Sequence, residues 1–231
     1  MQAAKRVLRG HRRQSDERPR QVAPISLSVL RALVGQCARR GDTLTTRGVR
    51  DRALVTLGWA LAARRSELVA LNITDVRRRP EGVLVGVTRA KTSDRAHDVH
   101  VPWAASQIDL CAVRAVHALL DLHADRGTTS GPLFRPMTKS DNFLHSRLTA
   151  QSVRLVIKRL AESAGVEVPD GFAPFAAHSL RRGFASQARR AGYDSLAIGR
   201  HAGFSDGSAA LNRYLSDDVD AWNHNPLKGL L

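Results

Sequence analysis

Cysteine and aromatic residues are scarce in this sequence, and no hydrophobic run is long. The two cysteines, Cys37 and Cys111, each lie inside an apolar stretch, so we expect neither a disulfide framework nor a cysteine-based zinc site. No stretch approaches the roughly 18 uninterrupted apolar residues of a membrane span. Aromatic residues make up 5% of the chain, too few for the base-stacking surfaces that bind single strands. We expect a protein of a reducing, cytosolic compartment.

Acidic residues are also few, with 21 Asp and Glu against 36 Lys and Arg, a formal charge of +15. This excess indicates a polyanionic partner, because Lys and Arg that neutralise phosphates release counterions. Arginine outnumbers lysine, and its guanidinium binds phosphate oxygens in pairs. The composition favours a basic protein surface that binds the phosphate backbone of a nucleic-acid duplex. The alternative is that a GC-rich genome encodes arginine wherever a solvated cation suffices.

The rest of the composition is that of a globular protein, with 43% hydrophobic and 25% charged residues among 231. Apolar residues recur at helical spacing along most of the chain, whereas valines alternate over 83–87 and 99–101. The predicted helices cover 27–37, 47–62, 66–71, 105–124, 150–164, 178–191, 195–202 and 207–215. We predict a mainly α fold with a small antiparallel β-sheet (α+β), whose two strands flank the loop 89–97.

The charge and pattern divide the chain into three segments. Residues 1–23 are predominantly basic and lack the apolar core of a secretory signal, so we expect an interdomain linker or arm. Residues 24–215 form the predicted folded domain and contain no internal repeat. Residues 216–231 form an irregular tail that ends in leucines and packs either on a neighbouring protomer or on its own domain.

Two clusters of charged residues could hold an anion. His178 and Arg181 are three apart on a predicted helix, so they share a face and could both donate to one phosphate. Arg64 precedes a predicted helix start that Ser66 could cap, and Glu67 could hold an arginine by charge-assisted hydrogen bonds. The alternatives are a solvated helix with a capping histidine and a surface ion pair.

Two single residues complete the candidates. Lys91 lies in the loop between the predicted strands, where a hairpin tip can extend an ammonium into a groove. Tyr214 is one of two tyrosines, with Tyr193, and lies on the last predicted helix. Alone, an exposed lysine and a helical tyrosine indicate little.

In order and character, these features resemble the catalytic domain of the tyrosine recombinases, the phage integrase family. That family carries an Arg before a Ser/Gly-Glu-Leu helix start, a hairpin Lys, a His-x-x-Arg box, a further His or Trp, and a C-terminal Tyr. The matching stretches are A-R-R-S-E-L at 63–68, K-T at 91–92, H-S-L-R-R-G-F-A-S at 178–186 and N-R-Y-L at 212–215. The resemblance covers residues 24–215.

The resemblance implies a site-specific DNA recombinase, or integrase, that cleaves and rejoins double-stranded DNA through a 3′-phosphotyrosine, without metal, cofactor or ATP. Tyr214 would attack the scissile phosphate, and Arg64 and Arg181 would hold its non-bridging oxygens. Glu67 would orient Arg64. A protein that is monomeric in solution would assemble as a tetramer on DNA. Relatives also carry an N-terminal core-binding domain, and K-R-V-L-R-G-H-R-R at 5–13 resembles the end of one.

The resemblance also implies roles for the remaining candidates. Lys91 would protonate the leaving 5′ oxygen, His178 would assist removal of the tyrosine proton, and His201 would steady the phosphate. His201 precedes Tyr214 by thirteen residues and Phe204 precedes it by ten, whereas relatives usually place their His or Trp nearer to the Tyr. We favour His201 because phenylalanine cannot donate a hydrogen bond; Phe204 would then pack where relatives place a Trp.

Three alternatives remain open at this point. A DNA-binding protein of the same fold could lack recombinase activity. A helix-turn-helix regulator could use 179–191 and 195–202 as its helix pair, which leaves Arg64 and Lys91 without a purpose. A topoisomerase of the related tyrosine-using type would share the same core chemistry.

Overall fold

The computed structural model describes residues 20–88, 96–204 and 208–216 of the chain. Lys91, residues 1–19 of the predicted arm and residues 217–231 of the predicted tail lie outside the described residues. The α-helices within them are α2 (Leu27–Gly35), α3 (Thr46–Ala60), α4 (Arg65–Ala70), α5 (Ala112–Ala124), α6 (Ala150–Ser163), α7 (Ala177–Arg190), α8 (Ser195–Ala202) and α9 (Ala209–Ser216). Short 3₁₀ turns cover Ile73–Asp75 and Ile108–Leu110. The predicted mainly α fold is confirmed.

The sheet contains three antiparallel strands in the order β3 (Val76–Arg79), β4 (Gly82–Thr88) and β5 (Ala96–Pro102). The two predicted strands are β4 and β5, and Val85 pairs with Val99 so that the alternating valines share one buried face. The sequence pattern does not predict β3, because its last three residues are exposed arginines and give no alternation. The hairpin β1 (Arg39–Arg40) and β2 (Thr43–Leu44) is also unpredicted, since each strand has two residues.

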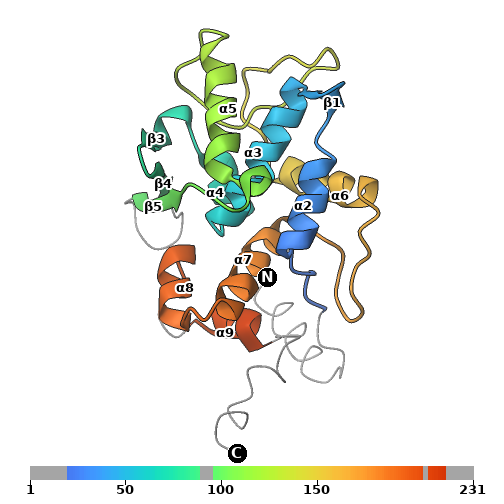
Figure 1. Ribbon diagram of the computed structural model, residues 1–231, viewed down its shortest axis with the longest axis vertical. Helices are drawn as coiled ribbons and strands as arrows, with labels where there is room; N and C mark the ends of the chain where they lie inside the picture. Colours follow the sequence, from blue (N-terminus) through green and yellow to red (C-terminus); the bar gives the residue numbers. More distant parts are fainter. Residues whose placement is uncertain (1–19, 89–95, 205–207, 217–231) are drawn as a thin grey trace, which may run out of the picture.

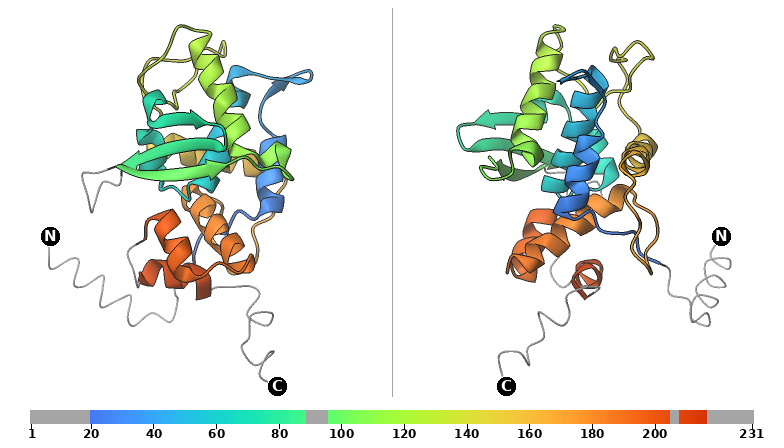
Figure 2. Two further views of the ribbon diagram at one scale, coloured as in Figure 1. Left: turned by 60° about the vertical axis from the view of Figure 1, so that its left-hand side comes forward. Right: turned by 45° about the vertical axis from the view of Figure 1, so that its right-hand side comes forward.

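Helix α3 runs through the centre of the molecule, with α2, α5 and α7 packed against it (Figure 1). The sheet and α6 lie on opposite sides of α3 (Figure 2). Apolar side chains from these layers meet in one cluster, which includes Leu54 and Leu57 of α3, Val85 of the sheet, Val116 of α5 and Ile157 of α6. Burial of this cluster supplies the main favourable term for folding.

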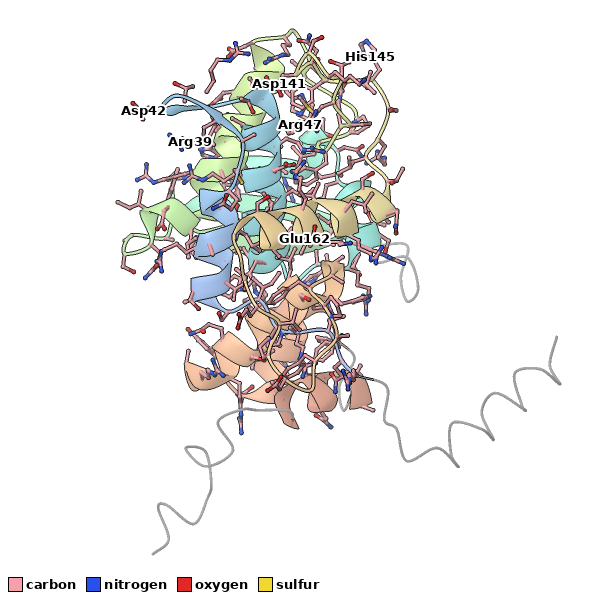
Figure 3. The ribbon with its side chains drawn as sticks, turned by 90° about the vertical axis from the view of Figure 1, so that its right-hand side faces the viewer. Arg39, Asp42, Arg47, Asp141, His145 and Glu162 are labelled. Atoms are coloured by element: carbon pink, nitrogen blue, oxygen red, sulfur yellow. The ribbon has the colours of Figure 1, made fainter. Side chains whose placement is uncertain are left out.

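The two ends of α3 face different parts of the molecule. At its amino end the Thr45 hydroxyl accepts from the N–H of Gly48 at 3.1 Å. The Asp141 carboxylate accepts from the N–H groups of Thr46 and Arg47 at 2.7 and 2.9 Å. Figure 3 shows Asp141 and Arg47 at the end of the molecule remote from α7, α8 and α9. The carboxyl end of α3 is therefore the end that meets the helices carrying the candidate residues.

Residues 21–25, named the strap here, precede α2 and lie beside Ala173 and the start of α7, with a parallel bridge between Val22 and Ala173. The N–H of Ala23 donates to the Ala173 carbonyl, and the N–H of Ile25 donates to the Ser179 carbonyl, both at 3.0 Å. These bonds fix the strap to the helix that carries His178, the neighbour of Ser179 in the chain.

The carbonyl of Ile25 lies in a crowded position between α3 and α7. It accepts from Trp59 Nε1 at 3.0 Å. A Cβ built on Gly183 would lie 1.9 Å from the Ile25 oxygen, so only glycine permits this approach of strap and helix. This close packing of the Ile25 carbonyl against Gly183 joins the strap to α7.

Candidate active site

The carboxyl end of α3 presents backbone carbonyls to two predicted site residues. The Ala60 carbonyl accepts from His201 Nε2 at 2.7 Å, and the Ala62 carbonyl accepts from Arg181 Nη1 at 2.6 Å. Ala62 is fully buried and has a φ of 48°, a left-handed conformation that costs a residue with a Cβ about 1 kcal/mol. The turn therefore holds its carbonyl toward Arg181 at the expense of backbone strain.

Arg64 lies directly after this turn and forms the N-cap of α4. Glu67, which is 5% exposed, accepts from the Arg64 N–H at 2.8 Å and from its Nη1 at 2.5 Å. The carboxylate thus contacts both the backbone and the guanidinium of Arg64. The prediction that Ser66 caps the helix is wrong, because α4 begins at Arg65 and the Glu67 carboxylate takes the capping role. With a side chain 43% exposed, Arg64 keeps part of its guanidinium in solvent.

Arg181 is 2% exposed in the first half of α7. Its Nη1 donates to the carbonyls of Ala62 and Ala202, each at 2.6 Å, and so joins the ends of α3 and α8. Its Cζ atom lies 3.7 Å from the centroid of the Phe204 ring, a close cation–π contact. The guanidinium is held by backbone on one side and by an aromatic face on the other.

His178 is exposed at the start of α7 and lies within the electrostatic field of the two arginine motifs. Desolvation lowers the pKa of His178, and the cations of Arg65, Arg181 and Arg64 lower it further, with Glu67 as a weaker opposing influence. The imidazole is therefore neutral at pH 7 and able to accept a proton. Arg64 and Arg65 precede His178 by more than a hundred positions in the sequence, and both are among the cations that act on it.

His201 is half-buried near the carboxyl end of α8. Its Nε2 donates to the Ala60 carbonyl, and its ring stacks on the ring of Phe184, with 4.6 Å between centroids and 19° between planes. The histidine is thus fixed against α3 and α7. The structure brings it to the same helix end that holds Arg181.

Tyr214 lies half-buried on α9, against α7 and α8 of its own chain. Its ring meets the Phe204 ring edge-on, with 5.8 Å between centroids and 79° between planes. The Cζ atom of Arg182 lies 6.0 Å from the centroid of the tyrosine ring. Phe204 thus touches Arg181 with one face and Tyr214 with another part of its ring, and links the two residues. The second tyrosine, Tyr193, is 59% exposed in the α7–α8 turn.

The model of the phage integrase family matches residues 26–220. The chain belongs to the phage integrase family. A XerD homologue from Selenomonas ruminantium is 38% identical over 158 residues, which are 66% of this chain and 43% of the homologue. The tyrosine recombinase XerD of Ralstonia nicotianae is 30% identical over 162 residues, which are 69% of this chain and 46% of that protein.

Solved structures of two recombinases and an integrase show the same fold. XerA recombinase superposes with a TM-score of 0.64 at 20% identity, covering 90% of this chain and 66% of XerA. XerH bound to its palindromic difH substrate gives 0.63 at 15% identity, covering 91% of this chain and 53% of XerH. A lambda integrase dimer bound to a core site superposes with a TM-score of 0.60 at 13% identity, covering 87% of this chain and 50% of the integrase chain. The chain spans less than half the length of the curated relatives it matches.

Two residues to which the resemblance gives no catalytic role, Arg182 and Phe204, also contact the site of this integrase family member. Arg182 is 1% exposed and contacts the Tyr214 ring, and Phe204 covers Arg181. The signal for Arg182 is its place beside Arg181 in a helix whose buried face contains both arginines. Lys91 falls between β4 and β5, outside the described residues.

In the described part of the chain, neither a cluster of metal ligands nor an exposed thiol accompanies these residues. Within residues 20–88, 96–204 and 208–216, no cluster of three or more His, Cys, Asp and Glu side chains could hold a metal ion. No helix in these segments has the length and apolar composition to cross a bilayer. Both cysteines are buried and free, and burial together with Asp51 raises the pKa of Cys37 to about 12. That thiol stays protonated and unreactive.

Proposed function

We propose that residues 24–215 form the catalytic domain of a site-specific DNA recombinase, which cleaves and rejoins double-stranded DNA through a 3′-phosphotyrosine. One observation carries this proposal: the carboxyl end of α3 gathers Arg64, Arg181 and His201, while Phe204 links Arg181 to Tyr214. Two cations, an imidazole and a phenol are groups that a phosphoryl transfer without metal can use.

The proposed chemistry conserves the phosphodiester bond energy. The Tyr214 oxygen forms a bond to phosphorus, and the bond from phosphorus to the 5′ oxygen breaks. His178 accepts the phenol proton, and Lys91 supplies a proton to the leaving 5′ oxygen. The reverse reaction, with a 5′-hydroxyl as nucleophile, rejoins the strand and releases the tyrosine. Neither step consumes ATP.

Arg64 and Arg181 are the proposed ligands of the two non-bridging oxygens. Negative charge grows on these oxygens in the transition state, where fixed cations are most effective. Loss of one such group typically lowers the rate by about 10²–10³. Glu67 keeps the Arg64 guanidinium oriented, and His201 is proposed to steady the phosphate.

The partners follow from the chemistry and the charge. A formal charge of +15 suits double-stranded DNA, and exchange between two duplexes cuts four strands, so we propose a tetramer on DNA and a monomer in solution. The cytoplasm, where DNA is accessible, is the proposed location. Residues 1–23 are proposed as a linker or arm, and residues 216–231 as a tail that packs on a neighbouring protomer.

A nicked duplex tests the nucleophile directly. Duplexes tiled across the DNA beside the gene, each nicked close to the tested phosphate, let the cut fragment diffuse away and trap the covalent adduct. We expect an adduct that survives denaturing electrophoresis with the wild-type chain and with Tyr193→Phe, and none with Tyr214→Phe. An adduct retained in Tyr214→Phe would assign the nucleophile to another residue.

One observation favours a second candidate, a DNA-binding protein of the same fold without recombinase activity. Arg181 is 2% exposed and lies under Phe204, so in this conformation its guanidinium is covered. The same tiled duplexes separate the candidates. Specific binding of one intact duplex with no adduct on any nicked version would establish the second.

A further inference from the structure

Arg182 connects the strap to the helix that carries Tyr214. It is 1% exposed in α7, directly after Arg181. Its Nη1 donates to Gln21 Oε1 at 2.8 Å and to the Val22 carbonyl at 3.1 Å. On the other side, its Cζ atom lies 4.8 Å from the centroid of the Phe172 ring and 6.0 Å from that of Tyr214. One buried guanidinium thus lies between the strap and the ring of Tyr214.

The strap provides a fixed reference for this contact. Its backbone is bonded to Ala173 on one side and to Ser179 of α7 on the other. The crowded position of the Ile25 carbonyl, between Trp59 and Gly183, leaves little room for the strap to shift. A guanidinium that donates to the strap therefore has one preferred position, because charge-assisted hydrogen bonds in a buried site are strong and directional.

Helix α9 packs on the rest of the domain through a small set of apolar contacts. It is short, and its packing depends on a small apolar cluster with Ala185, Ile198 and Leu211. The Tyr214 ring makes two further contacts, a cation–π contact with the Arg182 guanidinium and an edge-on contact with the Phe204 ring. Placement of the tyrosine ring thus depends on where Arg182 is held.

We propose that Arg182 is a positioning residue for Tyr214 and that Gln21 of the strap sets its position. This inference rests on the proposed function, in which Tyr214 is the nucleophile. Arg182 touches no reacting atom; it acts by holding the tyrosine ring at a fixed place beside Phe204. Small displacements of a nucleophile slow a reaction strongly, since misplacement by about 1 Å can cost about 10²-fold in rate.

The kinetic test compares Gln21→Ala and Arg182→Lys with the wild-type chain on the nicked duplex that forms an adduct. We expect cleavage at saturating DNA to slow by at least about tenfold in each variant, with Kd for DNA unchanged. The double variant should lose no more than the stronger single one, because both break one connection. Gln21→Glu, which keeps the acceptor, should restore the wild-type rate. Arg189→Ala, exposed on the same helix, is the matched control.

A second measurement does not depend on cleavage. The chain has two tyrosines, so ring-labelled tyrosine gives two NMR signals, which Tyr193→Phe assigns. Gln21→Ala should shift the Tyr214 signal and leave that of Tyr193 in place. An unmoved Tyr214 signal, or wild-type cleavage by folded Gln21→Ala, would overturn the inference even if Arg182→Lys fails to fold. Absence of any wild-type adduct would count against the proposed function alone.

Discussion

At the scale of single residues, His178 combines exposure with a lowered pKa. Desolvation and the cations of Arg65, Arg181 and Arg64 all disfavour its charged form. A group whose pKa is depressed by folding stays neutral below its ordinary range and becomes protonated only as the pH falls through the lowered value. In its proposed role as proton acceptor, His178 should therefore remain active in mildly acidic solution.

Arg65→Gln tests this electrostatic origin. Removal of one nearby cation should raise the pKa of His178 toward its ordinary value of about 6.5, so the acid limb of the cleavage rate should move to higher pH. NMR titration of the His178 ring gives the same shift without DNA. Arg189→Gln, also on the surface but absent from the groups that act on His178, should leave the titration unchanged. A limb that stays in place in Arg65→Gln would contradict this origin.

The partners of the candidate residues could not be predicted from the sequence. The His-x-x-Arg and Arg-x-x-Glu spacings indicate Arg64, Glu67 and Arg181 because side chains three apart on a helix are neighbours. The group that holds Arg181, however, is the carbonyl of Ala62, and every residue carries a carbonyl. Backbone acceptors give no sequence pattern, so a pattern can indicate a cation but not what orients it.

At the scale of elements, the contact of the strap with α7 is the tightest backbone approach near the site. Gly183→Ala would place a methyl carbon 1.9 Å from the Ile25 oxygen, so strap and helix must separate. We expect a loss of about 1–3 kcal/mol in the free energy of unfolding, the usual cost of overpacking. Urea unfolding followed by circular dichroism measures it.

Gly35→Ala is the matched control for this substitution. Gly35 is the last residue of α2, and a Cβ there would meet no atom within 4 Å. Alanine should leave the stability unchanged or raise it by up to about 1 kcal/mol, because glycine is the weaker helix former. Equal effects of the two substitutions would show that the strap yields easily.

The elements themselves differ in how far periodicity reveals them. The sequence predicts helix α6 over 150–164, and the structure has it at Ala150–Ser163, because Val153, Val156, Ile157 and Leu160 form an unbroken apolar stripe. Strand β3 shows no such stripe, since it is an edge strand whose arginines face solvent. Tertiary pairing with β4, rather than its own pattern, defines it as a strand.

At the scale of the whole molecule, a buried ion cluster ties α3 to α6. Asp51 is fully buried on α3, and its carboxylate meets Arg50 Nε at 2.6 Å and the guanidinium of Arg159 from α6. Arg50 is itself 4% exposed, and desolvation lowers its pKa. Both arginines lie against the same Asp51 carboxylate, and this attraction offsets part of the cost of burying the charges.

Asp51→Ala would leave the buried Arg50 guanidinium without its carboxylate. We expect a loss of about 3–5 kcal/mol in the free energy of unfolding, the cost of an uncompensated buried charge. Asp98→Ala is the control, since Asp98 and its partner Arg77 are each 45% exposed and such surface pairs contribute about 0–1 kcal/mol. Urea denaturation of both variants gives the comparison, and similar losses would mean that burial does not decide the effect.

The two carbonyls that share Arg181 Nη1 have a thermodynamic consequence for ligand recognition. In the free protein this N–H group already has good acceptors, one at the end of α3 and one at the end of α8. In the proposed function an incoming phosphate would compete with them, so the affinity gained at Arg181 would be the difference between two sets of hydrogen bonds and not the full strength of either. Weak binding of the substrate phosphate at this guanidinium would favour catalysis. The more highly charged transition state could then gain more from Arg181 than the substrate does.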